Sequence, residues 1–277
     1  MQNNNQEAYV HLSADKKTLT FYYDALRAER DGTTWGIEDK KEYLNDLIPA
    51  WVGNSKSPNT SILTAVFDAS FREFRPTSTE VWFYSLESLT NIKDLEHLNT
   101  SQVTDMSGMF LGCSSLTEIN LSHFDTSQVT NMRSMFSGCS SLTSLDLSSF
   151  DTSKVTDMSY MFSGCKSLIT IYCKSSWNCD SSANMFTGCV SLSGAAAYEK
   201  GRDDVSMANP QTGYFTKNVL TKENGAYVLL TADKKTLTFY FDRKRNFYKG
   251  DCWLIEGTTG KDDNKISLWA DCAKKSK

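Results

Sequence analysis

The apolar residues in the middle of the chain recur at a nearly fixed interval. A Met-Phe pair occurs four times, and a cysteine follows the methionine of each pair four positions later. The pairs begin at Met109, Met135, Met161 and Met185, and the cysteines are Cys113, Cys139, Cys165 and Cys189. The interval is 26 residues twice and then 24, and a weaker copy begins at Trp82. Such self-similarity is typical of repeat proteins, so residues 62–192 are predicted to form about five coils.

Each repeat contains a short alternating segment that is typical of a β-strand. In residues 142–147, LTSLDL, polar and apolar positions alternate, which directs Leu145 and Leu147 towards the interior. The predicted strands centre on Val66, Ile92, Ile119, Leu145 and Ile171. Strands that recur once per coil lie side by side, so they are expected to form a parallel ladder.

The segment that carries the Met-Phe pair is predicted to form one or two helical turns. In residues 157–165, DMSYMFSGC, four apolar residues fall on one helical face. They are Met158, Met161, Phe162 and Cys165. Asp157 is a suitable N-cap, and Gly164 suits the left-handed position that ends the turn. Met, Phe, Cys and Leu are therefore expected to build the interior, and Ser, Thr, Asn and Asp the surface.

A second, longer repeat links the two ends of the sequence. Residues 8–38 match residues 226–256 without a gap, and 19 of the 31 positions are identical. In each copy two alternating segments flank the polar sequence ADKK, a pattern that predicts a β-hairpin. Trp35 and Trp253 occupy equivalent positions and are expected to pack across the hairpin. Because the open ends of a stacked array need covers, the hairpin modules are predicted to act as caps, with independent ligand binding as the less favoured alternative. The second copy is either a closing cap or a truncated duplicate.

The repeat LTSLDLSSFDTSKVTDMSYMFSGC resembles those of the BspA-like leucine-rich-repeat surface proteins of Bacteroidetes and the mycoplasma-type lipoproteins. The resemblance covers residues 62–216 and ends in TGYFT, which is similar to the exit segment of that family. It implies a right-handed, leucine-rich-repeat-like solenoid. It also implies a function in cell-surface adhesion, with an extracellular host or bacterial protein, or a glycan, as the partner and with no cofactor.

Four domains are predicted from these patterns. They are an N-terminal β-hairpin module over residues 1–60, the repeats over 61–192, an exit segment over 193–216 and a second hairpin module over 217–277. The expected fold class is mainly β with short helical turns. Within it, a leucine-rich-repeat-like right-handed solenoid of about five coils is flanked by two homologous β-hairpin modules.

The outward positions of the predicted strands form the candidate binding surface. They are Glu118, Asn120, Ser144 and Asp146. Short polar side chains lose little entropy on binding and offer many hydrogen bonds, so this face suits a protein or glycan partner. The alternative is a structural spacer or stalk with no ligand; an apolar or aromatic patch within the face would favour binding. Tyr22 and Tyr240, in the hairpin modules, are the second choice of contact surface.

The four cysteines in register are predicted to be buried as small apolar side chains. Leu86 takes the same position in the weak copy, and leucine can only pack there. Disulfides or a metal ladder are the less favoured alternatives. Cys173 with Cys179, and Cys252 with Cys272, lie outside the register and are possible pairs.

Histidine and carboxylate residues also recur from one repeat to the next. His97 and His123, 26 residues apart, could titrate together or bind a metal, although solvated histidines are the preferred interpretation. Two columns of Asp and Asn residues are Asn99, Asp125 and Asp151, and Asp105, Asn131 and Asp157. Oxygen ligands suit Ca²⁺, but local turns and caps explain both columns without a metal.

Composition and missing motifs argue against several functional classes. The net charge of −4, from 29 basic and 33 acidic residues, gives no broad basic field for nucleic acid. No apolar run approaches the ~20 residues of a membrane-spanning helix, so no direct membrane span is expected. GxSxG, HExxH and P-loop motifs are absent, so we expect no enzyme. The N-terminus lacks a signal-peptide pattern; the expected extracellular or cell-surface location implies a removed leader, and a cytoplasmic location stays open.

Overall fold

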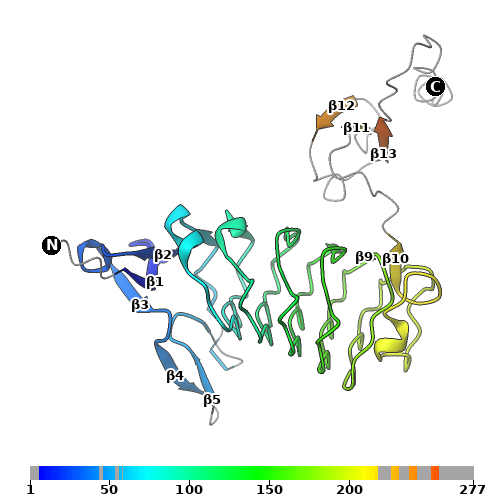
Figure 1. Ribbon diagram of the computed structural model, residues 1–277, viewed down its shortest axis with the longest axis horizontal. Coiled ribbons are helices and arrows are strands. Elements are labelled where there is room, and N and C mark those ends of the chain that lie inside the picture. Colours follow the sequence, from blue (N-terminus) through cyan, green and yellow to red (C-terminus); the bar gives the residue numbers. More distant parts are fainter. Residues whose placement is uncertain are drawn as a thin grey trace. The chain divides into compact units, whose positions relative to one another are not determined.

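The computed structural model in Figure 1 describes residues 6–43, 46–53, 56–57 and 59–217, together with the backbone of three strands between residues 226 and 255. The chain divides into two compact units, Met1–Asn218 and Val219–Lys277. The fold is mainly β. Within the described ranges its helices are four short 3₁₀ turns: η1 (Arg27–Glu29), η2 (Ala69–Glu73), η3 (Leu95–His97) and η4 (Val205–Met207).

The first unit begins with the hairpin that the ADKK pattern predicted. β1 (Glu7–Leu12) pairs antiparallel with β2 (Thr18–Asp24) on one side and with β3 (Thr33–Gly36) on the other. The turn between β1 and β2 is closed by the Asp15 carboxylate, which accepts hydrogen bonds from Ser13 Oγ and the Lys17 amide. A further hairpin, β4 (Lys40–Tyr43) with β5 (Asp46–Pro49), was not predicted from the sequence.

The N-terminal hairpin is continuous with the first repeats. β2 pairs in parallel with β6 (Thr64–Phe67), and β6 pairs in parallel with β7 (Asn91–Lys93). The resulting sheet has the order β3-β1-β2-β6-β7. The hairpin therefore extends the ladder of repeat strands through backbone hydrogen bonds.

The later repeats form a second parallel sheet, and one predicted strand is missing between the two sheets. β8 (Ser144–Asp146), β9 (Thr170–Cys173) and β10 (Phe215–Lys217) have the order β10-β9-β8. Strands therefore exist at Val66, Ile92, Leu145 and Ile171, but the prediction of a strand at Ile119 is wrong. Within the described residues, the amides of residues 118–120 make no backbone hydrogen bond. The adjacent β7 offers only a three-residue edge, because Asp94 turns away with a left-handed φ of 54°.

The Met-Phe side of each repeat is a series of turns, and the predicted helical turns are wrong. Alternate amides donate to the following repeat: Met132 to the Asp157 carbonyl, Phe136 to that of Met161, and Gly138 to that of Ser163. Two residues per repeat adopt a left-handed backbone, for example Ser134 with a φ of 55° and Gly138 with 75°. The left-handed residues direct alternate amide groups towards the next repeat, where they donate to its carbonyl groups. In a helix, the same amides would donate to carbonyl groups of their own segment.

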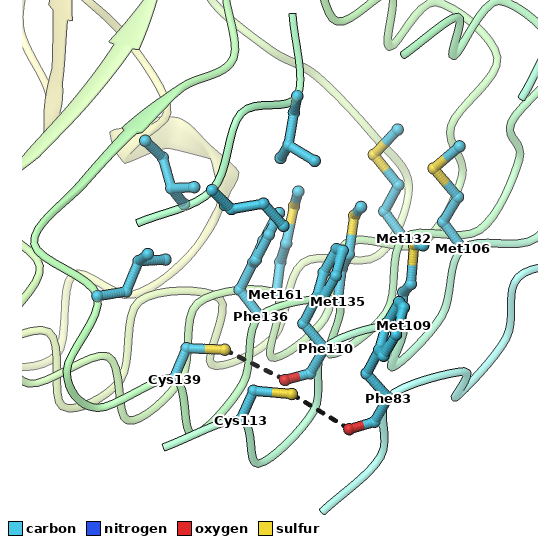
Figure 2. Close-up of a cluster of buried hydrophobic side chains, with 14 of the residues drawn as sticks. Phe83, Met106, Met109, Phe110, Cys113, Met132, Met135, Phe136, Cys139 and Met161 are labelled. Carbon is cyan, nitrogen blue, oxygen red and sulfur yellow. Dashed lines mark hydrogen bonds between the residues drawn. The ribbon is translucent and has the colours of Figure 1, made fainter. Parts of the chain in front are cut away.

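Buried side chains stack along the repeats in columns. The rings of Phe83, Phe110, Phe136, Phe162 and Phe186 are all fully buried, with neighbouring centroids 5.4–5.8 Å apart. Figure 2 shows part of this column, with the methionines of successive repeats lying beside it in the same order. Phe21 and Phe67 continue the aromatic core towards the hairpin, and Tyr214 contacts Phe186 at the other end. The inward assignment of the Met, Phe, Cys and Leu positions is confirmed.

The second unit repeats the strand pairing of the first hairpin. β11 (Ala226–Leu230) pairs antiparallel with β12 (Leu237–Phe241) and with β13 (Asp251–Ile255). The pair Val10↔Phe21 corresponds to Val228↔Phe239, so the register is preserved at the offset of 218 residues. The proposed Cys252–Cys272 pair and the packing of Trp253 lie outside the described residues.

Candidate functional site

The four predicted contact residues lie on the outside of the repeats. Glu118 and Asn120 are exposed and Ser144 and Asp146 are half-buried, whereas Ile119 and Leu145 between them are buried. Ser144 and Asp146 of β8 pair with Thr170 and Tyr172 of β9, so these two residues of β9 belong to the same outer surface. We refer to these outward residues as the strand face. They are Glu118, Asn120, Ser144, Asp146, Thr170 and Tyr172.

Tyr172 is the member of the strand face that the sequence reasoning missed. It lies on β9 between the buried Ile171 and Cys173, so its half-buried ring belongs to the outer side. Its backbone carbonyl accepts a hydrogen bond from the Leu147 amide, which fixes β9 against β8. The alternation in TIYC was the available signal. The ring adds an aromatic surface beside Asp146 in an otherwise polar row.

The two columns of Asp and Asn side chains close local turns. The Asn99, Asp125 and Asp151 side chains accept hydrogen bonds from the amides two residues later, as do those of Asp105, Asn131 and Asp157. Burial acts to raise the pKa of Asp157, but hydrogen bonds from Ser159 and the charge of Arg133 outweigh it and lower that pKa. In the described part of the chain, no group of three or more His, Cys, Asp or Glu residues is arranged to hold a metal ion.

The cysteine column belongs to the core. Cys113, Cys139, Cys165 and Cys189 are free thiols that donate to the backbone carbonyls of Phe83, Phe110, Phe136 and Phe162 over 3.0–3.1 Å. Two of these bonds are drawn in Figure 2. Burial raises the pKa of all four thiols, that of Cys189 to about 12. The packing interpretation is confirmed. Cys173 and Cys179 are also free, so the alternative that they pair is wrong.

His97 and His123 come together with Arg72 around a pocket of about 400 Å³. The three residues follow one another at intervals of 25 and 26 positions, and Ser149 takes the corresponding position in the next repeat. We call this the His pocket; its wall also includes Glu96, Leu98, Asn99, Thr100, Ser101 and Asp125. Sequence reasoning found the two histidines but missed Arg72, because η2 lies in the degenerate first repeat.

Hydrogen bonding assigns the protonation state of His97. Nδ1 lies 2.8 Å from the Phe67 carbonyl oxygen, which can only accept, so Nδ1 carries the proton. Nε2 lies 2.6 Å from Nη2 of Arg72, which can only donate, so Nε2 is the acceptor. The ring is therefore neutral, and the positive charge of the pair is on Arg72.

His123 is the least satisfied polar side chain of the pocket. Its Nε2 is buried and has no hydrogen-bond partner in the described part of the chain. Burial lowers the pKa of His123, while a hydrogen bond to the Leu95 backbone and the charge of Glu96 act in the opposite direction. The ring is thus held neutral beside a polar cavity. The preferred expectation that both histidines are simply solvated is wrong, since each is engaged in this pocket.

The hairpin tyrosine proposed as the second choice is partly covered. The guanidinium carbon of Arg30 lies 3.5 Å from the ring centre of Tyr22, and Tyr9 stacks on the same ring. Burial, followed by the hydrogen bond to Asp24, raises the pKa of Tyr9 to about 12. This cluster fastens the hairpin to its neighbouring loop. The side chain of Tyr240 lies outside the described residues.

Comparison with known proteins gives one match. Residues 77–198 match the family described as "Mycoplasma protein of unknown function, DUF285". No curated protein and no solved structure matches the chain significantly. Across the described residues, no helix has the length and apolar character needed to cross a bilayer.

Proposed function

We propose that this chain is a non-enzymatic binding protein of the cell surface, whose repeats present the strand face to an extracellular protein or glycan. The repeats are interpreted as a right-handed, leucine-rich-repeat-like solenoid of the BspA-like type. Parallel bridges that join Ser78, Asp105, Asn131, Asp157 and Ser181 support this interpretation, as does the column of stacked rings. The match to a mycoplasma family is consistent with the resemblance of the repeat sequence.

The observation that carries the binding proposal is Tyr172 on the strand face. A passive stalk needs only a uniformly polar surface, whereas a binding surface gains from an aromatic group among hydrogen-bonding neighbours. Tyr172 is in register with Asp146 on β8 and with Thr216 on β10, so polar side chains flank the ring on both sides. Protein and glycan partners both use such combinations.

The segment at residues 118–120 adds a second supporting feature. It lies between β7 and β8, its amides are outside any ladder, and Glu118 and Asn120 are exposed. A partner can therefore reach the side chains of Glu118 and Asn120 on either side of the buried Ile119. Neighbouring weak contacts that repeat along the array then act together.

The alternative function is a structural spacer without a ligand. A test is a screen of immobilised extracellular-matrix proteins and a glycan array with the full chain, followed by titration of each hit by surface plasmon resonance. We expect a reversible ligand whose affinity falls at least about tenfold in Asp146→Arg and in Asn120→Arg, through lost hydrogen bonds and steric exclusion. Equal binding by wild type and both variants would remove the strand face as the site.

The matched control is Ser149→Arg, an exposed substitution in the same repeat but outside the strand face. Like Asn120→Arg it adds one positive charge, whereas Asp146→Arg also removes a negative charge, so the control measures the general electrostatic effect expected of Asn120→Arg. Circular dichroism and the unfolding midpoint of all three variants establish that folding is retained. A screen in which no matrix protein or glycan binds the wild type would favour the spacer.

A further inference from the structure

The His pocket contains hydrogen-bond donors that the protein itself does not use. Arg72 is exposed, and one of its nitrogens, Nη2, is bonded to His97. Its Nε and Nη1 have no hydrogen bond within the described part of the chain. Asn99 accepts from the amide and the hydroxyl of Ser101 through Oδ1, which leaves its Nδ2 group as a further donor.

Unused acceptors lie in the same pocket. Asp125 accepts from the Ser127 amide through Oδ1, while Oδ2 makes no hydrogen bond to any described residue. Glu96 is exposed in the pocket wall and close enough to His123 to act on its charge. Nε2 of His123, buried and without a partner, is the acceptor that gains most from a new donor, because an unpaired buried polar atom is costly.

This mixture of groups discriminates among ligand classes. An anion would be attracted by Arg72 but repelled by Glu96 and Asp125. A cation would be attracted by the two carboxylates but repelled by Arg72. The neutral His97 adds no positive charge for an anion. A metal ion lacks a suitable set of three ligands in the described residues. Hydroxyl groups on adjacent carbon atoms each donate and accept, so they satisfy both kinds of group at once.

We propose that the His pocket binds one neutral sugar residue of a glycan, held by Arg72, His123 and Asp125. The volume of about 400 Å³ falls within the ~300–1,000 Å³ of small-molecule sites. The pocket shares no residue with the strand face, so this proposal does not rest on the function proposed for that surface.

The three histidines of the chain allow a direct test by NMR. The full chain, labelled with ¹⁵N, is titrated with the methyl glycosides of mannose, galactose and N-acetylglucosamine, and the imidazole nitrogens are followed. We expect at least one of these sugars to give a saturable shift of His123 and His97. His11, which bonds to the Asp31 carbonyl in the hairpin, is the internal control and should not move.

Two substitutions locate the binding. Arg72→Gln removes the charge and most donors from an exposed side chain, and His123→Ser installs the residue that Ser149 provides in the next repeat. Each is expected to weaken the binding of the sugar at least about tenfold. Lys166→Gln, which removes one positive charge from an exposed residue outside both the His pocket and the strand face, should leave it unchanged. Circular dichroism checks that each variant is folded.

Three results would overturn the proposal. One is the absence of a saturable shift of His97 and His123 with all three glycosides at concentrations of tens of millimolar. Another is a sugar affinity that is unchanged in folded Arg72→Gln, which would put the sugar elsewhere. The third is a saturable shift with sulfate or N-acetylneuraminic acid but with none of the neutral sugars, which would assign the pocket to an anion.

Discussion

Single residues of the phenylalanine column have the largest expected effect on stability. Phe136 is fully buried between Phe110 and Phe162, so truncation removes contacts with two repeats at once. Phe136→Ala should lower the free energy of unfolding by ~3–5 kcal/mol, from lost transfer energy and the cavity that remains. Ser144→Ala, on the strand face, should change it by less than ~0.5 kcal/mol. Urea titrations of both variants that gave equal shifts would mean that the inward register is misassigned.

The four cysteines of the column should not react with thiol reagents in the folded protein. Only the thiolate attacks thiol reagents, and burial raises the pKa of Cys113, Cys139, Cys165 and Cys189. We expect these four residues to be labelled by a maleimide only after unfolding, as read by mass spectrometry of peptides. The half-buried Cys179 serves as the reference for a partly accessible thiol. Fast labelling of the column in native buffer would contradict the packing assignment.

His123 predicts one component of the pH dependence of stability. Burial lowers its pKa in the folded protein below the ordinary 6.5, so the unfolded chain binds this proton more readily. Above the pKa of His123 in the unfolded chain, the ring is neutral in both states and this residue does not lower the free energy of unfolding. As the pH falls below that pKa, the unfolded chain takes up the proton first, so the free energy of unfolding decreases. Between about pH 7.5 and about pH 5.5, the midpoint of urea unfolding should fall less in His123→Ser than in wild type. An equal or steeper fall in the variant would contradict this assignment.

At the scale of the repeat element, two left-handed positions set the shape of each turn. Gly112, Gly138, Gly164 and Gly188 occupy the second position with φ between 75° and 79°. A Cβ on Gly164 would have no neighbour closer than 3.6 Å, so substitution there tests backbone strain and not crowding. Gly164→Ala should cost ~1–2 kcal/mol and Gly164→Asn less, because Asn tolerates this conformation. The unfolding midpoints of the two variants give the comparison, with Ser163→Ala as the neighbouring control; an Asn variant less stable than the Ala variant would refute the argument.

The sequence predicted those features of the repeat that recur in every copy. Periodicity placed Phe136, Leu145 and Cys139 correctly, since a buried column requires the same residue type at each level. Periodicity could not reveal that the strand at Ile119 is absent, because apolar and polar residues alternate there as in the other repeats. Whether a strand forms depends on the edge of β7 that is available for pairing. Arg72 was missed for a related reason: the first repeat is degenerate, and only the fold aligns its turn with those of His97 and His123.

At the scale of the whole molecule, two related hairpin modules have different expected effects on stability. In the first module β2 pairs with β6, and the ring of Phe21 packs against Phe67, Phe83 and Trp82. Residues 219–277 form a compact unit of their own. The contacts of the first module with the repeats therefore predict that residues 1–60 contribute strongly to the stability of the array.

Deletion of each module tests this difference. Removal of residues 1–60 exposes the edge of β6 and the apolar side chains of Phe67 and Trp82, so the repeats should lose cooperativity, unfold at lower urea or aggregate. Removal of residues 219–277 leaves the pairing of β2 with β6 and the packing of Phe21 on Phe67 intact, so the urea midpoint should fall less than in the first deletion. The fluorescence of Trp82 and Trp177, both buried in the first unit, monitors the unfolding. A shift of similar size in both deletions would show that the second module also stabilises the repeats, because a cap contributes to stability only through contacts with the array that it covers.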